Sequence, residues 1–210
     1  MKGVLFVVSL MIFSVTGLQA QEFEGMISYD NIYESKTSEI SSEQLNNLMG
    51  TEQAYVIKGN NYKSAFNGVF ISLHLYRGDE NRSYMLTGKI DTLYWEDYSL
   101  NKDKAISYEI KENQDTILGV PCDVLVIQAE KSKTYFYYSS KYGINPELFT
   151  KHNYGNWYYT ISKTKALPLK TVFENEQFIM ISVATEITPM KLENNVFEIQ
   201  YKSKVAKATW

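Results

Sequence analysis

The 210-residue chain contains a single cysteine, Cys122, and only two histidines, His74 and His152. One thiol cannot form a disulfide within the chain, so packing has to stabilise the folded state. The separation of the two histidines matches none of the usual metal-ligand spacings. Burial in the apolar run around Cys122 would raise the pKa of its thiol and leave it unreactive. We therefore expect no metal site, no cofactor and no cysteine-dependent chemistry.

An excess of positive charge is also absent, because 21 lysines and arginines face 24 aspartates and glutamates. Nucleic-acid binding needs clustered positive charge to displace counterions, so this balance argues against a nucleic-acid partner. Beyond residue 20 the sequence holds no nucleophile elbow, phosphate-binding glycine loop or zinc-binding cysteine pair. Acidic pairs such as Glu96 and Asp97 fall on predicted strand edges, where most are solvated. We predict no catalytic residues and a chain that is not an enzyme.

Long apolar runs are confined to one segment, residues 4–15, which follows Met1 and Lys2 and precedes small polar residues. Twelve apolar residues are too few for a helix across a hydrocarbon core of about 30 Å, which takes about 20. A short basic start, an apolar stretch and a polar end are typical of a secretory signal. We predict a signal peptide over residues 1–20, cleaved after Ala20.

Cleavage after Gly17 and retention as an uncleaved anchor are the alternatives for this segment. Because no cysteine lies near the cleavage region, we expect no lipid-anchored N-terminus. Residues 21–210 hold no further run of spanning length, so we predict no transmembrane segment there. We expect this remainder to form one domain, exported to the periplasm or the exterior of a Gram-negative bacterium.

Short runs of alternating apolar and polar residues fill the predicted domain, and Gly, Asn and charged clusters separate them about every ten residues. This pattern predicts a mainly β fold built on an antiparallel sheet or barrel. The 17 tyrosines suit half-buried strands, since the ring packs while the hydroxyl reaches a partner. The expected strands are 23–33, 53–58, 62–66, 69–75, 83–87, 91–98, 105–113, 115–119, 123–130, 133–140, 156–163, 167–175 and 178–187.

Helix signals are few. Ser41 and Gln44 form a capping box that predicts a helix over residues 42–49. Asn145 can cap a second short helix over 146–149, which begins with proline. Both helices are too short to persist alone, so we expect them to pack on the sheet. Tight turns are expected at 59–61, 77–82, 130–131 and 175–176.

Several segments together carry a family resemblance: FEGMISY, AYVIKGNNYKS, TILGVPCDVL, YFYYSS, ALPLK and VATEITPMKLENNVFEI. In these segments the chain resembles an exported bacterial family of unknown function that looks related to the periplasmic lipoprotein carriers and their outer-membrane lipoprotein receptor. The resemblance implies a curved antiparallel sheet that forms an incomplete, or half, β-barrel. It also implies that short helices close the concave face, with residues 42–49 as a lid, and that the interior can shelter an acyl chain.

A concave apolar face would favour a hydrophobic small molecule or acyl chain, because each buried methylene contributes about 0.8 kcal/mol. Strand alternation predicts the residues that line this candidate cavity: Ile71, Leu73, Leu75, Leu93, Trp95, Phe136, Tyr138, Trp157, Tyr159 and Ile161. The same residues would equally fill a dry core. We predict a non-enzymatic module that binds a lipid-like or other hydrophobic ligand. The alternative is an envelope interaction module that docks a partner through a strand edge or an aromatic face.

Overall fold

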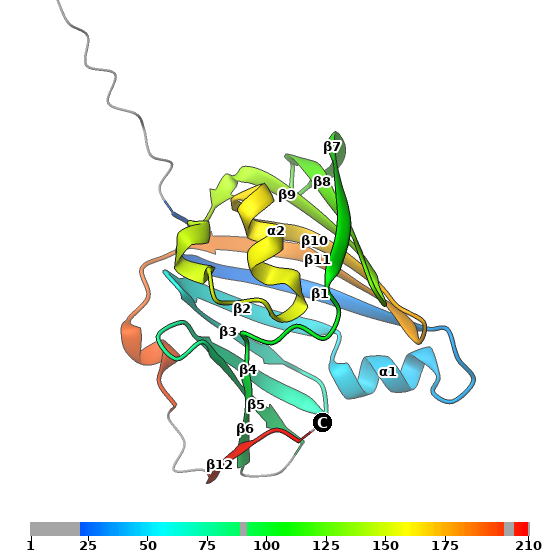
Figure 1. Cartoon of the computed structure of the whole chain (residues 1–210), viewed down its shortest axis with the longest axis vertical. Helices are drawn as coiled ribbons and strands as arrows, with labels where there is room; N and C mark the ends of the chain where they lie inside the picture. The colour runs from blue at the N-terminus through cyan, green and yellow to red at the C-terminus, as the bar shows by residue number, and fades with distance from the viewer. Residues whose placement is uncertain (1–21, 89–91, 200–203, 210) are drawn as a thin grey trace, which may run out of the picture.

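The computed structural model describes residues 22–88, 92–199 and 204–209. Its strands form a single curved sheet that does not close into a barrel (Figure 1). The predicted mainly β, half-barrel class is therefore confirmed. The predicted signal peptide, residues 1–20, lies outside the described residues. Among the residues that are described, no helix is both long and apolar enough to cross a bilayer.

Twelve strands make up the described part of the sheet. They are β1 (Gly25–Ser35), β2 (Glu52–Lys58), β3 (Asn61–Phe66), β4 (Ile71–Arg77), β5 (Arg82–Thr87), β6 (Thr92–Asp97), β7 (Ala105–Ile117), β8 (Val120–Ala129), β9 (Lys133–Gly143), β10 (Ala166–Glu174), β11 (Phe178–Pro189) and β12 (Lys204–Lys207). The four expected turns all connect neighbouring strands. Residues 105–113 and 115–119, expected as two strands, belong mainly to the single strand β7, whose pairing with β8 is interrupted between Lys111 and Asp115.

The strand order is β12-β6-β5-β4-β3-β2-β1-β11-β10-β9-β8-β7. Strands β1 to β6 and strands β7 to β11 therefore form two antiparallel meanders, which pair through β1 and β11. The chain passes from β6 to β7 through residues 98–104, although these two strands lie far apart in the order. Figure 1 shows this connection crossing in front of the sheet.

Helical segments are short: α1 (Ser42–Met49), η1 (Pro146–Phe149), η2 (Tyr154–Asn156), α2 (Trp157–Thr164) and η3 (Asn194–Phe197). The first follows the prediction, including the capping box. The second also does, since the Asn145 side chain accepts a hydrogen bond from the backbone N–H of Glu147. Neither η2 nor η3 was predicted from the sequence.

The strand expected at residues 156–163 is wrong, because these residues form α2. Their aromatic and β-branched side chains favour a strand, but tertiary packing outweighs that preference. Ile161 and Thr164, one helical turn apart, are both buried, and Trp157 packs against the main core on the same face.

Asn156 fixes the start of α2. Its backbone adopts the left-handed conformation, with φ of 59°, which asparagine tolerates better than most residues. The Asn156 side-chain oxygen accepts hydrogen bonds from the Asn101 side chain and the Ala105 backbone, and its amide donates to the Asp103 carbonyl. Asn156 thereby ties α2 to the segment that connects β6 and β7.

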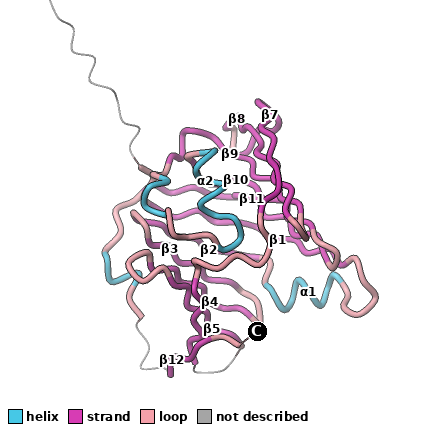
Figure 2. Tube along the Cα trace, viewed as in Figure 1, coloured by secondary structure: helices cyan, strands magenta, loops and turns pink. Residues whose placement is uncertain are grey.

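The two helices differ in position. Figure 2 shows α2 over the middle of the sheet and α1 beyond the ends of its strands. The α1 helix contacts β1 and buries none of its residues, and Asn46 bonds to the backbone of Tyr33. The expectation that residues 42–49 cover the concave face is therefore wrong, and α2 occupies that position.

The main core lies between the sheet and the segment that contains η1, η2 and α2. We call this side the α2 face. Phe149 and Ile161 come from the helical segment and are almost fully buried against sheet residues such as Ile27, Ile57 and Leu169. Such burial contributes about 1.5–3 kcal/mol for each large apolar side chain. The helical segment is thus held mainly by its apolar contacts with the sheet.

A second cluster lies on the opposite side of strands β3 to β6, which we call the η3 face. Here Phe197 of η3 is buried against side chains that include Leu75, Tyr84 and Leu93. The half of the sheet formed by β3 to β6 is consequently covered on both sides.

Candidate ligand-binding site

The ten predicted cavity residues do not form one surface. Leu73, Leu75, Leu93 and Trp95 belong to the cluster on the η3 face, so their expected inward orientation is wrong. Phe136 and Tyr138 lie on the α2 face, where they pack with Leu125 and Ala166. Trp157, Tyr159 and Ile161 also lie there, but they come from α2 and not from a strand. Ile71 is the first residue of β4 and is paired with Thr87.

The η3 segment explains the error in β4. Strand alternation correctly predicts that Leu73 and Leu75 lie on one face of β4 and that His74 and Tyr76 lie on the other. An apolar row usually marks the core side of a strand, but here η3 makes the opposite side apolar as well. The row that faces the main core holds His74 and Tyr76. Hydrophobicity alone therefore selected the wrong row.

A pocket of about 270 Å³ opens on the α2 face beside Trp157. It includes two of the ten predicted residues, Phe136 and Trp157. Its lining residues are Tyr29, Asn31, Tyr33, Gln53, Tyr55, Phe66, Phe136, Trp157, Leu167, Pro168, Thr171, Met180 and Ser182. Among these residues, none carries a formal charge. We call this hollow the tyrosine pocket.

Strand register accounts for the floor of the tyrosine pocket. In β1, alternation directs Tyr29, Asn31 and Tyr33 to the same face. Asn31 is paired with Ser182 of β11, and Ser182 is paired with Thr171 of β10. Three neighbouring strands thus place a polar row across an otherwise aromatic and apolar pocket.

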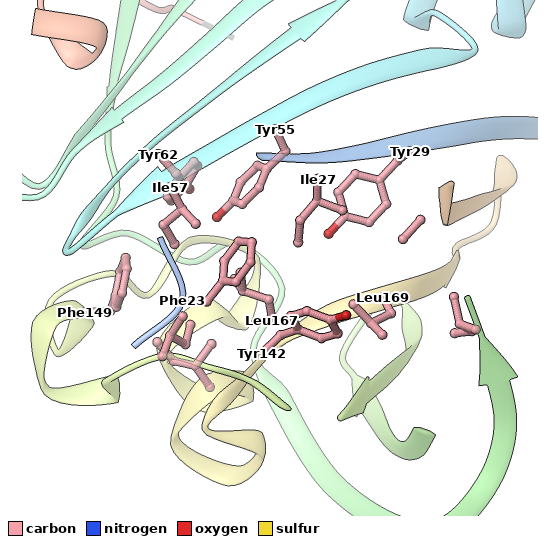
Figure 3. Close-up of a cluster of buried hydrophobic side chains, with 14 of the residues drawn as sticks. Phe23, Ile27, Tyr29, Tyr55, Ile57, Tyr62, Tyr142, Phe149, Leu167 and Leu169 are labelled. Atoms are coloured by element: carbon pink, nitrogen blue, oxygen red, sulfur yellow. The ribbon is translucent and has the colours of Figure 1, made fainter. Parts of the chain in front are cut away.

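Aromatic rings form one wall of the tyrosine pocket. The rings of Tyr29 and Tyr55 lie on the same side of β1 and β2 (Figure 3), with centroids 6.4 Å apart in an edge-to-face arrangement. The Tyr55 ring also contacts the Tyr62 ring, and the centroids of the Tyr62 and Trp157 rings are 6.1 Å apart. Such contacts fix ring positions and contribute about 0.5–1.5 kcal/mol beyond area burial. The wall is therefore shaped before any ligand binds.

Hydrogen bonding differs among the polar groups of the tyrosine pocket. The Tyr29 hydroxyl donates to the Pro168 carbonyl at 2.7 Å, and the Gln53 amide donates to Ser64 at 2.9 Å. By contrast, Asn31 Nδ2, Tyr55 Oη and Trp157 Nε1 are buried and have no hydrogen-bond partner within the described part of the chain. Buried donors in proteins are nearly always paired, so three unpaired donors at one pocket are unusual.

The tyrosine hydroxyls remain protonated at neutral pH. Burial raises the pKa of Tyr55 well above its usual value, and the neighbouring Tyr29 raises it further. Burial also raises the pKa of Tyr33, to about 12. Tyr55 therefore carries an O–H group at neutral pH and not a phenolate.

Three larger hollows also lie on the described surface, and each has at least one charged residue in its lining. One of about 420 Å³ is lined partly by Glu24 and Lys191, one of about 460 Å³ partly by Asp30 and Glu52, and one of about 290 Å³ partly by Lys104. Charged rims of this kind keep a groove hydrated. The smaller tyrosine pocket combines an apolar lining with a few convergent polar groups, which is typical of small-molecule sites.

The two histidines, separated by 78 positions, lie in one aromatic cluster next to the tyrosine pocket. His152 Nε2 is 2.8 Å from the Tyr62 hydroxyl, and His74 Nε2 is 2.8 Å from the Tyr98 hydroxyl. Ring contacts of Tyr62 and Tyr98 with both imidazoles join them. Burial lowers the pKa of His74 to about 4 and that of His152 to about 3. Both rings are therefore neutral at pH 7.

Cys122 takes no part in this cluster through any described hydrogen bond or ring contact. Its thiol is buried, and burial raises its pKa, as the sequence predicts. Within the described ranges, no three His, Cys, Asp or Glu side chains converge on a position that could hold a metal ion.

No family model matches the chain, and no curated protein matches it. Two solved structures titled PNGF-II, in the P21 and C2 space groups, resemble its backbone with TM-scores of 0.47 and 0.46 and identities of 14% and 12%. Each similarity covers 89% of this chain but only 32% and 31% of the respective neighbour, so the chain spans about a third of their length. A similarity this distant assigns the chain to no family and no activity.

Proposed function

We propose that this protein is a binding module that holds a compact hydrophobic ligand, or one end of an acyl chain, in the tyrosine pocket. The observation that supports the proposal is a preformed pocket of about 270 Å³ whose described lining is mostly aromatic or apolar and carries no formal charge. The helix α2 and the wall of tyrosine rings hold its shape. The proposal places binding on the α2 face and involves no reaction.

The pocket volume limits the ligand. Small-molecule pockets usually measure roughly 300–1,000 Å³, so the tyrosine pocket, at about 270 Å³, lies just below this range. Eight to ten buried methylenes would contribute about 6–8 kcal/mol before the entropic cost of association. We therefore expect dissociation constants on the order of 10 μM or weaker for a single-chain ligand.

The first prediction concerns N-phenyl-1-naphthylamine, a neutral apolar dye that fluoresces in apolar surroundings. The purified protein is expected to bind one dye molecule saturably. Replacing Thr171, which is half-buried in the pocket lining, by tryptophan fills the pocket. Thr171→Trp is expected to weaken dye binding at least about tenfold, as measured by fluorescence titration.

Thr185→Trp is the matched control, because Thr185 lies on the neighbouring strand β11, is exposed, and is not among the residues that line the tyrosine pocket. This variant is expected to bind the dye as the unmodified protein does. Circular dichroism would establish that both variants fold. Equal dye affinity for the two folded variants, or no saturable binding by the unmodified protein, would refute the proposal.

A second candidate function rests on the edge strand β7. This strand ends the described sheet and is 13 residues long, and nearly all of its residues are exposed. Ile106, Tyr108 and Ile110 present apolar surface there, with exposed fractions of 67%, 48% and 42%. A long edge with exposed apolar side chains can accept a further strand. We propose, as the alternative, that β7 pairs with an extended segment of an envelope protein.

The test of this alternative compares two lysine substitutions on β7. Ile110 is paired with the buried Leu125, whereas Ser107 is exposed and opposite Gln128. With a partner identified by crosslinking in envelope extracts, Ile110→Lys is expected to weaken its binding at least about fivefold. Ser107→Lys is expected to change it less than twofold. Equal effects of both substitutions would argue against pairing at the apolar face of this edge.

A further inference from the structure

The part of the chain that covers the α2 face is positively charged, in contrast to the protein as a whole. It consists of residues 98–104 and 144–165, which we call the covering layer, and Figure 1 shows it in front of the sheet. The layer contains five lysines and only two acidic residues, Asp103 and Glu147, whereas the whole chain has a net charge of −3. Positive charge is therefore concentrated on one side of an acidic protein.

Hydrogen bonds join the two parts of the covering layer. The Tyr98 carbonyl accepts from the backbone N–H groups of Asn153 and Tyr154. The Asn153 side-chain amide donates to the Ser99 carbonyl at 3.1 Å. The rings of Tyr98 and Tyr154 stack with their centroids 4.4 Å apart. Because the inner side of the layer packs on the sheet, the two parts together present one outer surface to solvent.

The lysines of the covering layer are available to a partner. Four of them are exposed and form no ion pair with a carboxylate in the described part of the chain: Lys104, Lys151, Lys163 and Lys165. Elsewhere, by contrast, Lys36 and Lys170 each lie 2.9 Å from a carboxylate oxygen. The positive charge of the layer is thus not neutralised by described acidic side chains.

Apolar side chains are exposed among these lysines. Leu100, Leu148 and Tyr154 have exposed fractions of 60%, 38% and 41%. Protein surfaces that bind bilayers combine lysines, which attract anionic headgroups, with apolar side chains that enter the boundary of the acyl region. A soluble polyanion would pair with the lysines but would leave the apolar side chains in water. The combination therefore favours a bilayer that contains anionic lipids.

From these observations we infer that the covering layer docks the protein onto an anionic lipid bilayer, with its lysines at the headgroups and Leu100, Leu148 and Tyr154 at the boundary of the acyl region. The inference goes beyond the proposed function, because none of these docking residues lines the tyrosine pocket. Trp157 belongs to both the layer and the pocket lining, so docking would bring the pocket close to the lipids. A few lysines and three apolar side chains give reversible and not permanent attachment.

Co-sedimentation with lipid vesicles tests the inference. The unmodified protein is expected to bind vesicles of equal parts phosphatidylglycerol and phosphatidylcholine at least about tenfold more tightly than vesicles of phosphatidylcholine alone. Raising the salt concentration from about 0.05 M to about 0.5 M is expected to weaken binding to the anionic vesicles at least about fivefold, because salt screens exposed charges. Equal binding to both kinds of vesicle, or binding to neither, would overturn the inference.

Charge substitutions locate the docking surface. Lys104, Lys151 and Lys165 are replaced together by glutamine, while Lys163 is kept because its ammonium lies 4.9 Å from the centroid of the Tyr108 ring. This triple variant is expected to bind the anionic vesicles at least about tenfold more weakly. The matched control loses the same charge through glutamine substitution of three exposed lysines outside the layer: Lys36, Lys111 and Lys204. Its affinity is expected to change less than about threefold, and equal weakening in both variants would contradict docking through the layer.

Serine substitutions test the apolar part of the surface. Leu100→Ser combined with Leu148→Ser is expected to weaken binding to the anionic vesicles about fivefold. The control combines Val69→Ser with Leu118→Ser, which are 56% and 49% exposed outside the layer, and is expected to bind as the unmodified protein does. Circular dichroism establishes that each variant folds. If heparin binds as tightly as the vesicles and the substitutions at Leu100 and Leu148 weaken neither, the layer recognises a soluble polyanion and the inference fails.

The outcomes separate docking from the proposed function. Dye binding in the tyrosine pocket is measured without vesicles, so its absence would refute the proposed function and leave the docking result unaffected. Conversely, saturable dye binding by a protein that does not bind anionic vesicles would refute docking alone. The triple lysine variant is expected to bind the dye as the unmodified protein does, because none of its substituted residues lines the pocket.

Discussion

Acidification from about pH 7 to about pH 4.5 is expected to lower the free energy of unfolding by roughly 3–5 kcal/mol. The physical reason is the burial of His74 and His152 in their neutral forms, which lowers the pKa of each ring to about 4 and about 3 respectively. In the unfolded chain both pKa values return to about 6.5. Because both folded-state pKa values lie below pH 4.5, the two rings are expected to contribute nearly equally.

The sign of the effect follows from proton binding. Between about pH 6.5 and pH 4 the unfolded chain holds up to two more protons than the folded protein, so falling pH favours unfolding. Above pH 6.5 neither state protonates these rings, and their contribution is constant. The pKa of the Asp79 carboxyl is lowered by a hydrogen bond from Arg77, so this group titrates below the window. Burial raises the pKa of Glu96, so protonation of Glu96 favours the folded state on acidification and partly offsets the effect of the two histidines. Urea unfolding at several pH values between 7 and 4.5 measures how the free energy of unfolding depends on pH.

Substitution isolates the histidine contribution. His152→Gln removes one titrating ring, so the decrease in stability across the same window is expected to shrink by about half, whatever the stability of the variant at pH 7. In the double variant with His74→Gln, the stability is expected to depend on pH much less steeply across this window. If the double variant loses stability on acidification as steeply as the unmodified protein, the assignment to these two rings is wrong.

Ile161→Ala is expected to lower the free energy of unfolding by about 2–5 kcal/mol, a typical cost for emptying a well-packed site. Ile161 is fully buried on α2, between the helix and the sheet. The helix has only eight residues and cannot persist without its contacts. Because Trp157 comes from the same helix, dye binding at the tyrosine pocket is expected to weaken as well. Chemical denaturation and fluorescence titration measure the two effects.

Ile32→Ala is the control for this substitution, because Ile32 is 53% exposed on β1 and its removal empties no space in the core. Its expected cost is at most about 1 kcal/mol, which reflects strand preference. Similar costs for the two substitutions would mean that α2 is not held by the packing of Ile161.

The general fold could be predicted because its signals are local. Alternating residues mark most strands, and residues that favour turns, such as Gly59 and Asn175, mark where the chain reverses. The helix α1 follows from two side chains that bond the first turn of backbone. Each of these signals acts within a few residues, so none requires knowledge of the tertiary structure.

The candidate site could be predicted only in part, because it depends on which face each long-range partner covers. Phe136 and Trp157 were identified, but Leu73 and Leu93 were assigned to the wrong side since the sequence gives no sign that η3 packs there. The residues that α2 needs are β-prone, and only their burial against the sheet makes them helical.

Asn31 and Tyr55 were missed for a different reason. In the sequence, one asparagine and one of 17 tyrosines on predicted strands carry no signal that distinguishes them from other strand residues. Their significance comes from the pairing of β1 with β2 and β11, which places their side chains at one pocket with Trp157. A polar residue on the apolar row of a predicted strand, as Asn31 is between Tyr29 and Tyr33, is the signal that could have found the site.

The connection between β6 and β7 limits how far the two margins of the curved sheet can separate. Only residues 98–104 lie between Asp97 and Ala105, so a fully extended connection reaches about 26–29 Å. Hydrogen bonds between the strands are missing at this place, but the covalent backbone itself spans it. The covalent connection therefore limits the width of the opening between the two margins of the half-barrel. A wider opening would require residues at the ends of β6 or β7 to leave the sheet.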